Sequence, residues 1–118
     1  MGIRGPAPKG HRSRERDQRR EDARWTVLHP DAVVRGPELP ADRDWPAATR
    51  TWWATWRRSA QAQLFDATDW WFLLDTALIH AAFSRGDTRH AAELRLRESK
   101  LGATPADLAR LRIVVETE

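Results

Sequence analysis

The sequence predicts an all-α protein with a helical hairpin core, flanking short helices and a disordered basic N-terminal arm. One long apolar segment, residues 68–85, is the stretch best suited to the centre of a core. A tryptophan-rich segment at helical spacing precedes it, and the excess of basic residues lies before position 25. These observations divide the 118 residues into a basic arm and Pro-rich linker, 1–44, and a helical oligomerisation domain, 45–118.

The central segment reads T-D-W-W-F-L-L-D-T-A-L-I-H-A-A-F-S-R from position 68. Thr68 is expected to cap this helix, with the carboxylate of Asp69 at the positive end of the helix dipole. Two apolar faces follow α-helical spacing, one formed by Trp70, Leu73, Leu74, Ala77 and Ala81 and the other by Trp71, Leu78 and Ala82. A helix that is apolar on most sides needs cover on most sides, so a second subunit is expected to supply part of it.

The N-terminal arm, residues 1–24, carries eight of the 20 basic and four of the 17 acidic residues, a net charge of +4. The remaining twelve basic and thirteen acidic residues give −1, so the whole positive excess lies in the arm. A basic segment on a near-neutral body is typical of contact with nucleic acid, and a solvated tail that aids solubility is the alternative. The candidate DNA-binding residues are Arg4, Lys9, Arg12, Arg14, Arg16, Arg19, Arg20 and Arg24.

The linker and the first folded segment are marked by prolines. Pro30, Pro37 and Pro40 predict an extended linker up to residue 44, and no strand is expected anywhere in the chain. Pro46 is suited to the first position of an amphipathic helix that runs to about residue 60. Three tryptophans at helical spacing, Trp52, Trp53 and Trp56, give this helix an aromatic stripe.

Two further helices are predicted after the central one. A helix over residues 89–101 has a narrow apolar seam that includes Leu94 and Leu101, and it would form the hairpin with residues 68–85. Gly102 is expected to end it. Thr104 then begins a last helix with a capping box closed by Asp107, and this helix is expected to reach about residue 113.

Nothing in the sequence indicates an active site, a metal site or a cofactor. There is no cysteine and no Gly-rich phosphate loop, and the four histidines are scattered. Asp66, Asp69 and Asp75 are close in sequence, but helix capping accounts for the first two, which disfavours a nuclease-type metal cluster. His80 is interpreted as a satisfied core or interface histidine. The protein is therefore not expected to be an enzyme.

The tryptophans and their neighbours allow two interpretations. Exposed indoles flanked by basic residues can stack nucleobases, but here the tryptophans lie among Leu and Ala at helical spacing, which favours core packing. Arg57 and Arg58 are interpreted as a solvated helix end. No apolar run approaches the length of a membrane span and the N-terminus lacks the features of a secretory signal, so a soluble protein of the cytoplasm is expected.

Several segments together resemble one known family. The opening G-I-R-G-P-A-P-K, the Pro-rich linker leading to Trp45, the helix segment W-W-A-T-W, and the close L-G-A-T-P-A-D-L-A-R-L-R are similar to phage terminase small subunits. The resemblance implies a non-catalytic, DNA-recognition subunit of a genome-packaging terminase, present in the host cytoplasm. Its implied partners are double-stranded DNA, the terminase large subunit that has the ATPase and nuclease, and further copies of itself in a ring.

The oligomer interface is expected to use apolar positions of the hairpin, namely Trp70, Trp71, Leu74, Leu78, Ala82, Leu94 and Leu101. The alternative function is a small helix-turn-helix DNA-binding transcriptional regulator, formed by the last two helices and the tight turn at Gly102. Against it, the last helix offers only Arg110 and Arg112 toward a DNA groove, with few side chains that could read bases. A dimer would favour the regulator and a larger ring the terminase.

Overall fold

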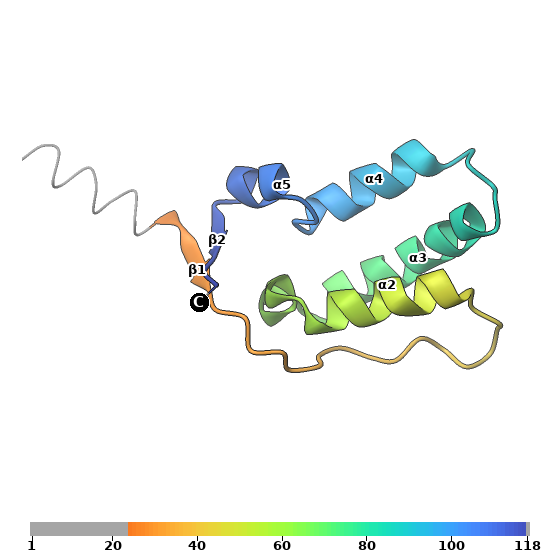
Figure 1. Ribbon diagram of the computed structural model, residues 1–118, viewed down its shortest axis with the longest axis horizontal. Coiled ribbons are helices and arrows are strands. Elements are labelled where there is room, and N and C mark those ends of the chain that lie inside the picture. The colour runs from red at the N-terminus through yellow and green to blue at the C-terminus, as the bar shows by residue number, and fades with distance from the viewer. Residues whose placement is uncertain (1–23, 118) are drawn as a thin grey trace, which may run out of the picture.

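The computed structural model describes residues 24–117, and within them the chain is mostly helical, as the sequence predicts. The elements are β1 (Thr26–Leu28), α2 (Ala47–Arg58), the 3-10 helix η1 (Ala60–Leu64), α3 (Ala67–Ser84), α4 (Ala91–Lys100), α5 (Pro105–Arg110) and β2 (Ile113–Val115). In Figure 1, α2 and α3 lie side by side, and the chain then returns through α4 and α5 to end beside β1. The division at residue 44 into two domains stays a prediction.

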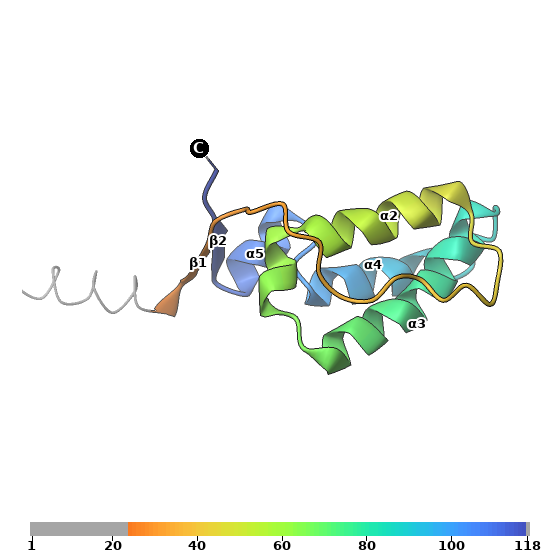
Figure 2. The ribbon, with the colours of Figure 1, turned by 90° about the horizontal axis from the view of Figure 1, so that it is seen from below.

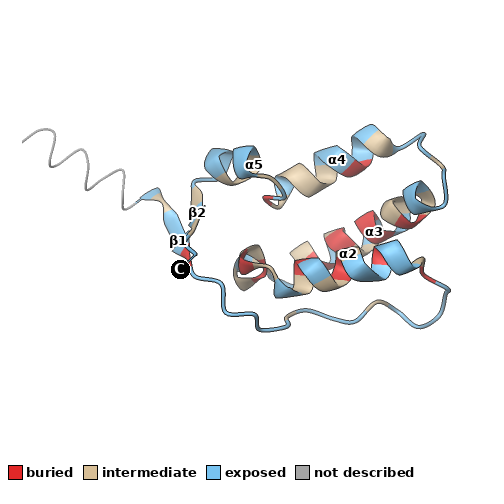
Figure 3. Cartoon of the chain, in the orientation of Figure 1, coloured by how far each residue is buried: buried red, intermediate tan, exposed pale blue. Residues whose placement is uncertain are grey.

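The core lies between α2 and α3, with α4 closing the predicted hairpin against α3. Three tryptophans, Trp53, Trp56 and Trp70, are each less than a tenth exposed, and Leu73 and Ala77 of α3 are fully buried. The indoles of Trp53 and Trp70 meet edge to face at 5.7 Å, a favourable geometry for two aromatic rings. Figure 3 shows buried positions on α2, η1 and α3, whereas α5 has none.

Helix α3 begins two residues earlier than predicted, because its N-cap is Asp66 and not Thr68. The Asp66 carboxylate accepts the backbone N–H of Asp69, and the Asp69 carboxylate accepts the N–H of Asp66, which is a complete capping box. The Thr68 hydroxyl donates to the Asp66 carboxylate at 2.7 Å. A carboxylate satisfies two donors at once here, and Thr68 already lies inside the helix.

The Pro-rich segment before α2 is extended, as predicted, but it is also fastened to the helices. Figure 2 shows it passing across α2 and α3. The indole N–H of Trp53 donates to the carbonyl of Pro37 at 2.9 Å, and the Arg57 guanidinium donates to the carbonyls of Arg35 and Gly36 at 2.8 Å each. The interpretation of Arg57 as a solvated helix end is therefore wrong. The valines Val33 and Val34, however, remain about half exposed.

The expectation that the chain has no strand is also wrong. β1 pairs in parallel with β2, with Thr26 opposite Ile113 and Leu28 opposite Val115, and the side chain of Leu28 is buried. The predicted last helix was too long, since α5 ends at Arg110 and Arg112 has a positive φ of 59°. Three successive β-branched residues follow and favour a strand over further helix.

Candidate interaction surfaces

The basic arm, the predicted DNA contact, lies almost wholly outside the described residues. Of its eight candidates, Arg24 alone falls within them, where it is exposed and lies two residues before β1. Because β1 is hydrogen-bonded to β2 and packs against η1, the position of the first described strand, two residues after Arg24, is fixed. The other seven are Arg4, Lys9, Arg12, Arg14, Arg16, Arg19 and Arg20.

The outer face of α3 is an apolar surface that the described part of the chain leaves uncovered. The inner face, with Trp70, Leu73 and Ala77, packs into the core. On the outer face Trp71 is 68% exposed and Leu78, two helical turns further along, is 43% exposed. A tryptophan and a leucine at this spacing form one side of a helix, so this surface is suited to a partner. Core packing, which was predicted for the tryptophans as a group, therefore does not hold for Trp71.

The seven predicted interface residues fall into three groups. Trp71 and Leu78 are exposed, whereas Trp70 and Leu94 are covered within one chain. The half-buried positions are Leu74, Ala82 and Leu101, of which Leu74 and Leu101 pack against the core cluster. Trp70 and Leu94 are therefore buried within a single chain. Of the predicted interface residues on α3, Trp71, Leu78 and Ala82 remain accessible to a partner.

A hollow of about 470 Å³ borders this outer face at the end where α3 meets the segment before α2. Leu78, Ala82 and Arg85 line it from α3 and the residue that follows, and Arg43 and Trp45 line it from the other side. The guanidinium of Arg85 donates to the carbonyl of Asp44, which holds the two walls together. The exposed apolar face of α3, with Trp71 and Leu78, is thus continuous with this hollow, because Leu78 belongs to both.

His80 makes a polar contact between α2 and α3, which agrees with its interpretation as a satisfied core or interface histidine. Its Nδ1 lies 2.9 Å from the Thr49 hydroxyl, and its ring stacks on the Trp52 indole at 4.7 Å. Burial lowers the pKa of His80, and the opposing charge of Glu98 raises it by less. The imidazole therefore joins α2 to α3 as a packed, hydrogen-bonded group.

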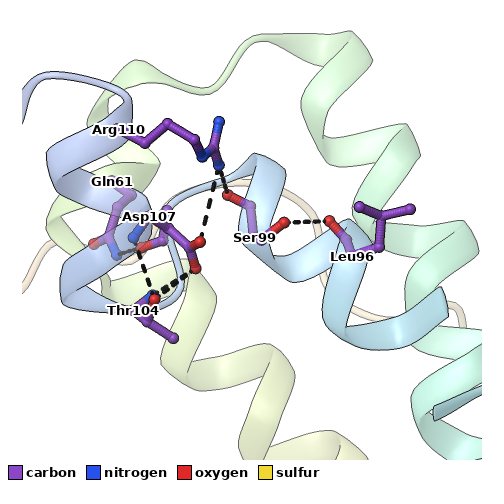
Figure 4. Close-up of polar contacts among 7 residues, drawn as sticks. Gln61, Leu96, Ser99, Thr104, Asp107 and Arg110 are labelled. Carbon is purple, nitrogen blue, oxygen red and sulfur yellow. Dashed lines mark hydrogen bonds and ion pairs between the residues drawn. The ribbon is translucent and has the colours of Figure 1, made fainter. Parts of the chain in front are cut away.

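The end of the hairpin near α5 is fastened by a set of polar contacts drawn in Figure 4. The Thr104 hydroxyl accepts the N–H of Asp107, and the Asp107 carboxylate accepts the N–H of Thr104, as the sequence predicts. The Arg110 guanidinium donates to the carbonyl of Ser99 at 2.6 Å, and the Gln61 amide donates to the carbonyl of Gly102 at 2.6 Å. These contacts fix α5 against the end of α4.

The length of α5 and the contacts of its arginine test the helix-turn-helix alternative. α5 is six residues long, and Arg110, one of its two basic candidates for a DNA groove, is used in contacts with Ser99 and Asp107. A recognition helix needs several free side chains along its length to reach base edges. The geometry therefore disfavours α5 as a recognition helix.

Sequence reasoning missed the pairing of Trp52 with Glu98. The indole N–H of Trp52, on α2, donates to Oε2 of Glu98, on α4, at 2.8 Å. The two residues are 46 positions apart, so no local spacing could have indicated the contact.

Within residues 24–117 no group of three or more His, Cys, Asp or Glu side chains is placed to hold a metal ion. No helix in that range is long and apolar enough to cross a membrane.

These features define a small helical protein that leaves one apolar helix face uncovered and carries a basic segment at its N-terminus. The chain belongs to a known family, because the family model for the phage terminase small subunit matches residues 3–118. Comparisons with curated proteins and with solved structures each gave no significant match. The family assigns the chain a part in phage genome packaging.

Proposed function

We propose that this chain is the non-catalytic, DNA-recognition subunit of a packaging terminase, which binds viral double-stranded DNA and presents it to the large ATPase and nuclease subunit. The observation that carries the DNA contact is the charge distribution, +4 in residues 1–24 against −1 in the remainder. Arginine and lysine side chains neutralise phosphates and release condensed counterions, which gives affinity without sequence reading.

The body of the protein supports the same assignment of roles. Few described side chains are suited to reading base edges, so one subunit should have a weak intrinsic sequence preference. Several arms arranged around an oligomer would add their affinities through effective concentration, and bending of the DNA could supply selectivity. The DNA-binding role therefore requires assembly as well as charge.

The assembly surface in this proposal is the outer face of α3, with Trp71, Leu78 and Ala82. Copies of the chain that cover this face would place their β1 strands, and with them the arms, at repeated positions. A ring of more than two subunits is the assembly that we propose, because rings generate such repetition by a closed head-to-tail interface.

A salt titration of DNA binding tests the proposal. The full chain is compared with a variant in which seven arm residues are replaced by Gln, namely Arg4, Lys9, Arg12, Arg14, Arg16, Arg19 and Arg20. Fluorescence anisotropy with a labelled duplex should show a steep loss of affinity with salt for the wild type, with a slope near −0.9 per phosphate neutralised. The variant should bind far more weakly and with a shallower slope.

Equal affinity and equal slope for the two proteins would place the DNA contact on the helical body. The control variant carries Gln at Arg58, Arg89 and Arg95, three exposed basic residues of the body, and should keep the wild-type slope.

A further inference from the structure

The polar and aromatic contacts between α2 and α4 border a cavity that the proposed DNA contact does not use. This cavity of about 260 Å³ is formed by Trp52, Trp56, Gln61, Glu98 and Ala103, together with two hydroxyl-bearing residues of α2 and its C-cap. Trp52 and Trp56 are one helical turn apart on α2, so both indoles contribute to the same wall.

The charge of this cavity is negative. Glu98 is the one ionisable residue among those that line it, and no Lys or Arg lines it. The Trp52 indole holds Oε2 of Glu98 at 2.8 Å, which fixes the carboxylate at the cavity wall. Within residues 24–117 no basic side chain forms an ion pair with Glu98, and its Oε1 accepts no hydrogen bond there.

Two indoles and a positioned carboxylate are the groups that bind a cationic side chain. The faces of tryptophan rings attract a guanidinium or ammonium group, and a carboxylate accepts charge-assisted hydrogen bonds from it. Guanidinium suits this site better than ammonium because its flat face can lie on an indole while its N–H groups reach the carboxylate. A neutral or anionic ligand would leave the carboxylate without a charge partner.

The arm is one source of guanidinium groups for this end of the molecule. It has six arginines before position 24, and β1, which begins at residue 26, packs against η1, the element that contributes Gln61 to the cavity. An extended chain spans about 3.3 Å per residue, so positions 12–20, which precede residue 24 by four to twelve residues, can lie at most roughly 13 to 40 Å from it.

We propose that the cavity between Trp52, Trp56 and Glu98 binds an arginine side chain of the basic arm. The arm then has two alternative acidic partners, the cavity in the free protein and DNA phosphates in the complex. This goes beyond the proposed DNA contact and does not depend on it, because the cavity is a feature of the protein alone.

The test follows the indole N–H resonance of Trp52 by NMR in the full chain without DNA. The resonance is assigned by its loss in Trp52→Phe, and the probe is N-acetyl-L-arginine amide, with N-acetyl-L-norleucine amide as the uncharged control. In the chain whose six arm arginines are replaced by Gln, the arginine probe should shift the Trp52 signal in a saturable manner, and the norleucine probe should not. No saturable shift with arginine in that variant would overturn the proposal, because it has no internal competitor for the cavity.

Glu98→Gln removes the charge and keeps an oxygen that can accept the Trp52 N–H. This variant should bind the probe at least about tenfold more weakly, as expected when a charge-assisted hydrogen bond is lost. Asp75→Asn, which removes one exposed carboxylate on α3, should bind within about twofold of the wild type and controls for net charge. Should Glu98→Gln unfold, Ala103→Leu narrows the cavity with the charge retained and should weaken the probe similarly.

A double-mutant cycle identifies the source of the bound side chain. Replacing Arg4, Arg12, Arg14, Arg16, Arg19 and Arg20 by Gln should move the Trp52 resonance before any probe is added, and should tighten probe binding because the internal competitor is gone. The same replacement in the Glu98→Gln background should leave the resonance unchanged. If the arm replacement has no effect in the wild-type background, the cavity does not bind the arm and the proposal is wrong.

Discussion

Gly36 lies directly against the indole of Trp70. A Cβ atom at this glycine would be 2.4 Å from Cε2 of the ring, and its φ is +74°. The Pro-rich segment can therefore cross the core tryptophan only where it has no side chain. The close approach also places the carbonyls of Arg35 and Gly36 within reach of Arg57.

Gly36→Ala should destabilise the fold by about 2–4 kcal/mol, because a left-handed backbone strain adds to overpacking against the ring. Chemical denaturation measures the change in the free energy of unfolding. Gly86→Ala is the matched control, since Gly86 also has a positive φ, +101°, but has open space around its Cβ position. A loss for Gly36→Ala no larger than that for Gly86→Ala would mean that the Trp70 contact is not close.

Arg57→Ala should cost about 1–2 kcal/mol, because two carbonyls of the extended segment lose a charged donor. Its neighbour Arg58 is exposed and has no such contact among the described residues, so Arg58→Ala should change stability by less than about 0.5 kcal/mol. Thermal denaturation followed by circular dichroism compares the two. Equal losses would show that the segment is not held by Arg57.

Thr104→Ala should cost about 1 kcal/mol, since the hydroxyl that accepts the N–H of Asp107 is lost. Thr55→Ala serves as the control, because its exposed hydroxyl donates to a carbonyl within α2 and caps no helix. Urea unfolding gives both values. An unchanged midpoint for Thr104→Ala would contradict the capping box at α5.

Asp31 supplies a pH dependence whose sign can be worked out. Hydrogen bonds from the Arg35 guanidinium and from the N–H of Val33 lower the pKa of Asp31 to about 2. A carboxyl with a lowered pKa in the folded state stabilises the fold above its usual pKa, and this contribution is lost as pH falls from about 4 to about 2. The Tm of the wild type should therefore exceed that of Asp31→Asn at neutral pH, and the difference should shrink over this range. A difference in Tm that stays constant between about pH 4 and pH 2 would contradict the lowered pKa of Asp31.

Leu78→Glu should reduce the size of the assembly, because it places a charge on the outer face of α3 where a second copy is proposed to pack. Light scattering coupled to size-exclusion chromatography measures the mass. Leu96→Glu, at a comparably exposed leucine on α4, should leave the mass unchanged. A wild-type protein that is monomeric at micromolar concentration would contradict the proposed oligomer.

Local sequence signals predicted the helices well and their ends less well. Spacing identified α2, α3 and α4, and the Thr104 and Asp107 pattern identified the start of α5. Errors arose where two local signals competed. Asp66 and Thr68 are both good caps, and the carboxylate prevailed because Asp69 could complete the box. After Arg110, β-branched residues gained a strand partner that no helix pattern could indicate.

The interaction surfaces were predicted only in part. The arm's charge is a property of composition, so the sequence indicated it directly. The exposed side of α3 could not be chosen in advance, because Trp70 and Trp71 are adjacent tryptophans and either face satisfied the helical spacing. The choice was made by packing, which places Trp70 between Trp53, Phe65 and Gly36 and leaves Trp71 outside.

The sequence by itself determined the helical class, the capped starts of α3 and α5 and the basic N-terminus, because each depends on residues within a few positions of one another. Tertiary structure alone decided the pairing of Leu28 with Val115, the crossing of Gly36 over Trp70 and the contact of Trp52 with Glu98. These contacts join residues separated by 34 to 87 positions, and they form only when the chain has folded back on itself. Burial and hydrogen bonding between distant segments select them, and no local pattern encodes that selection.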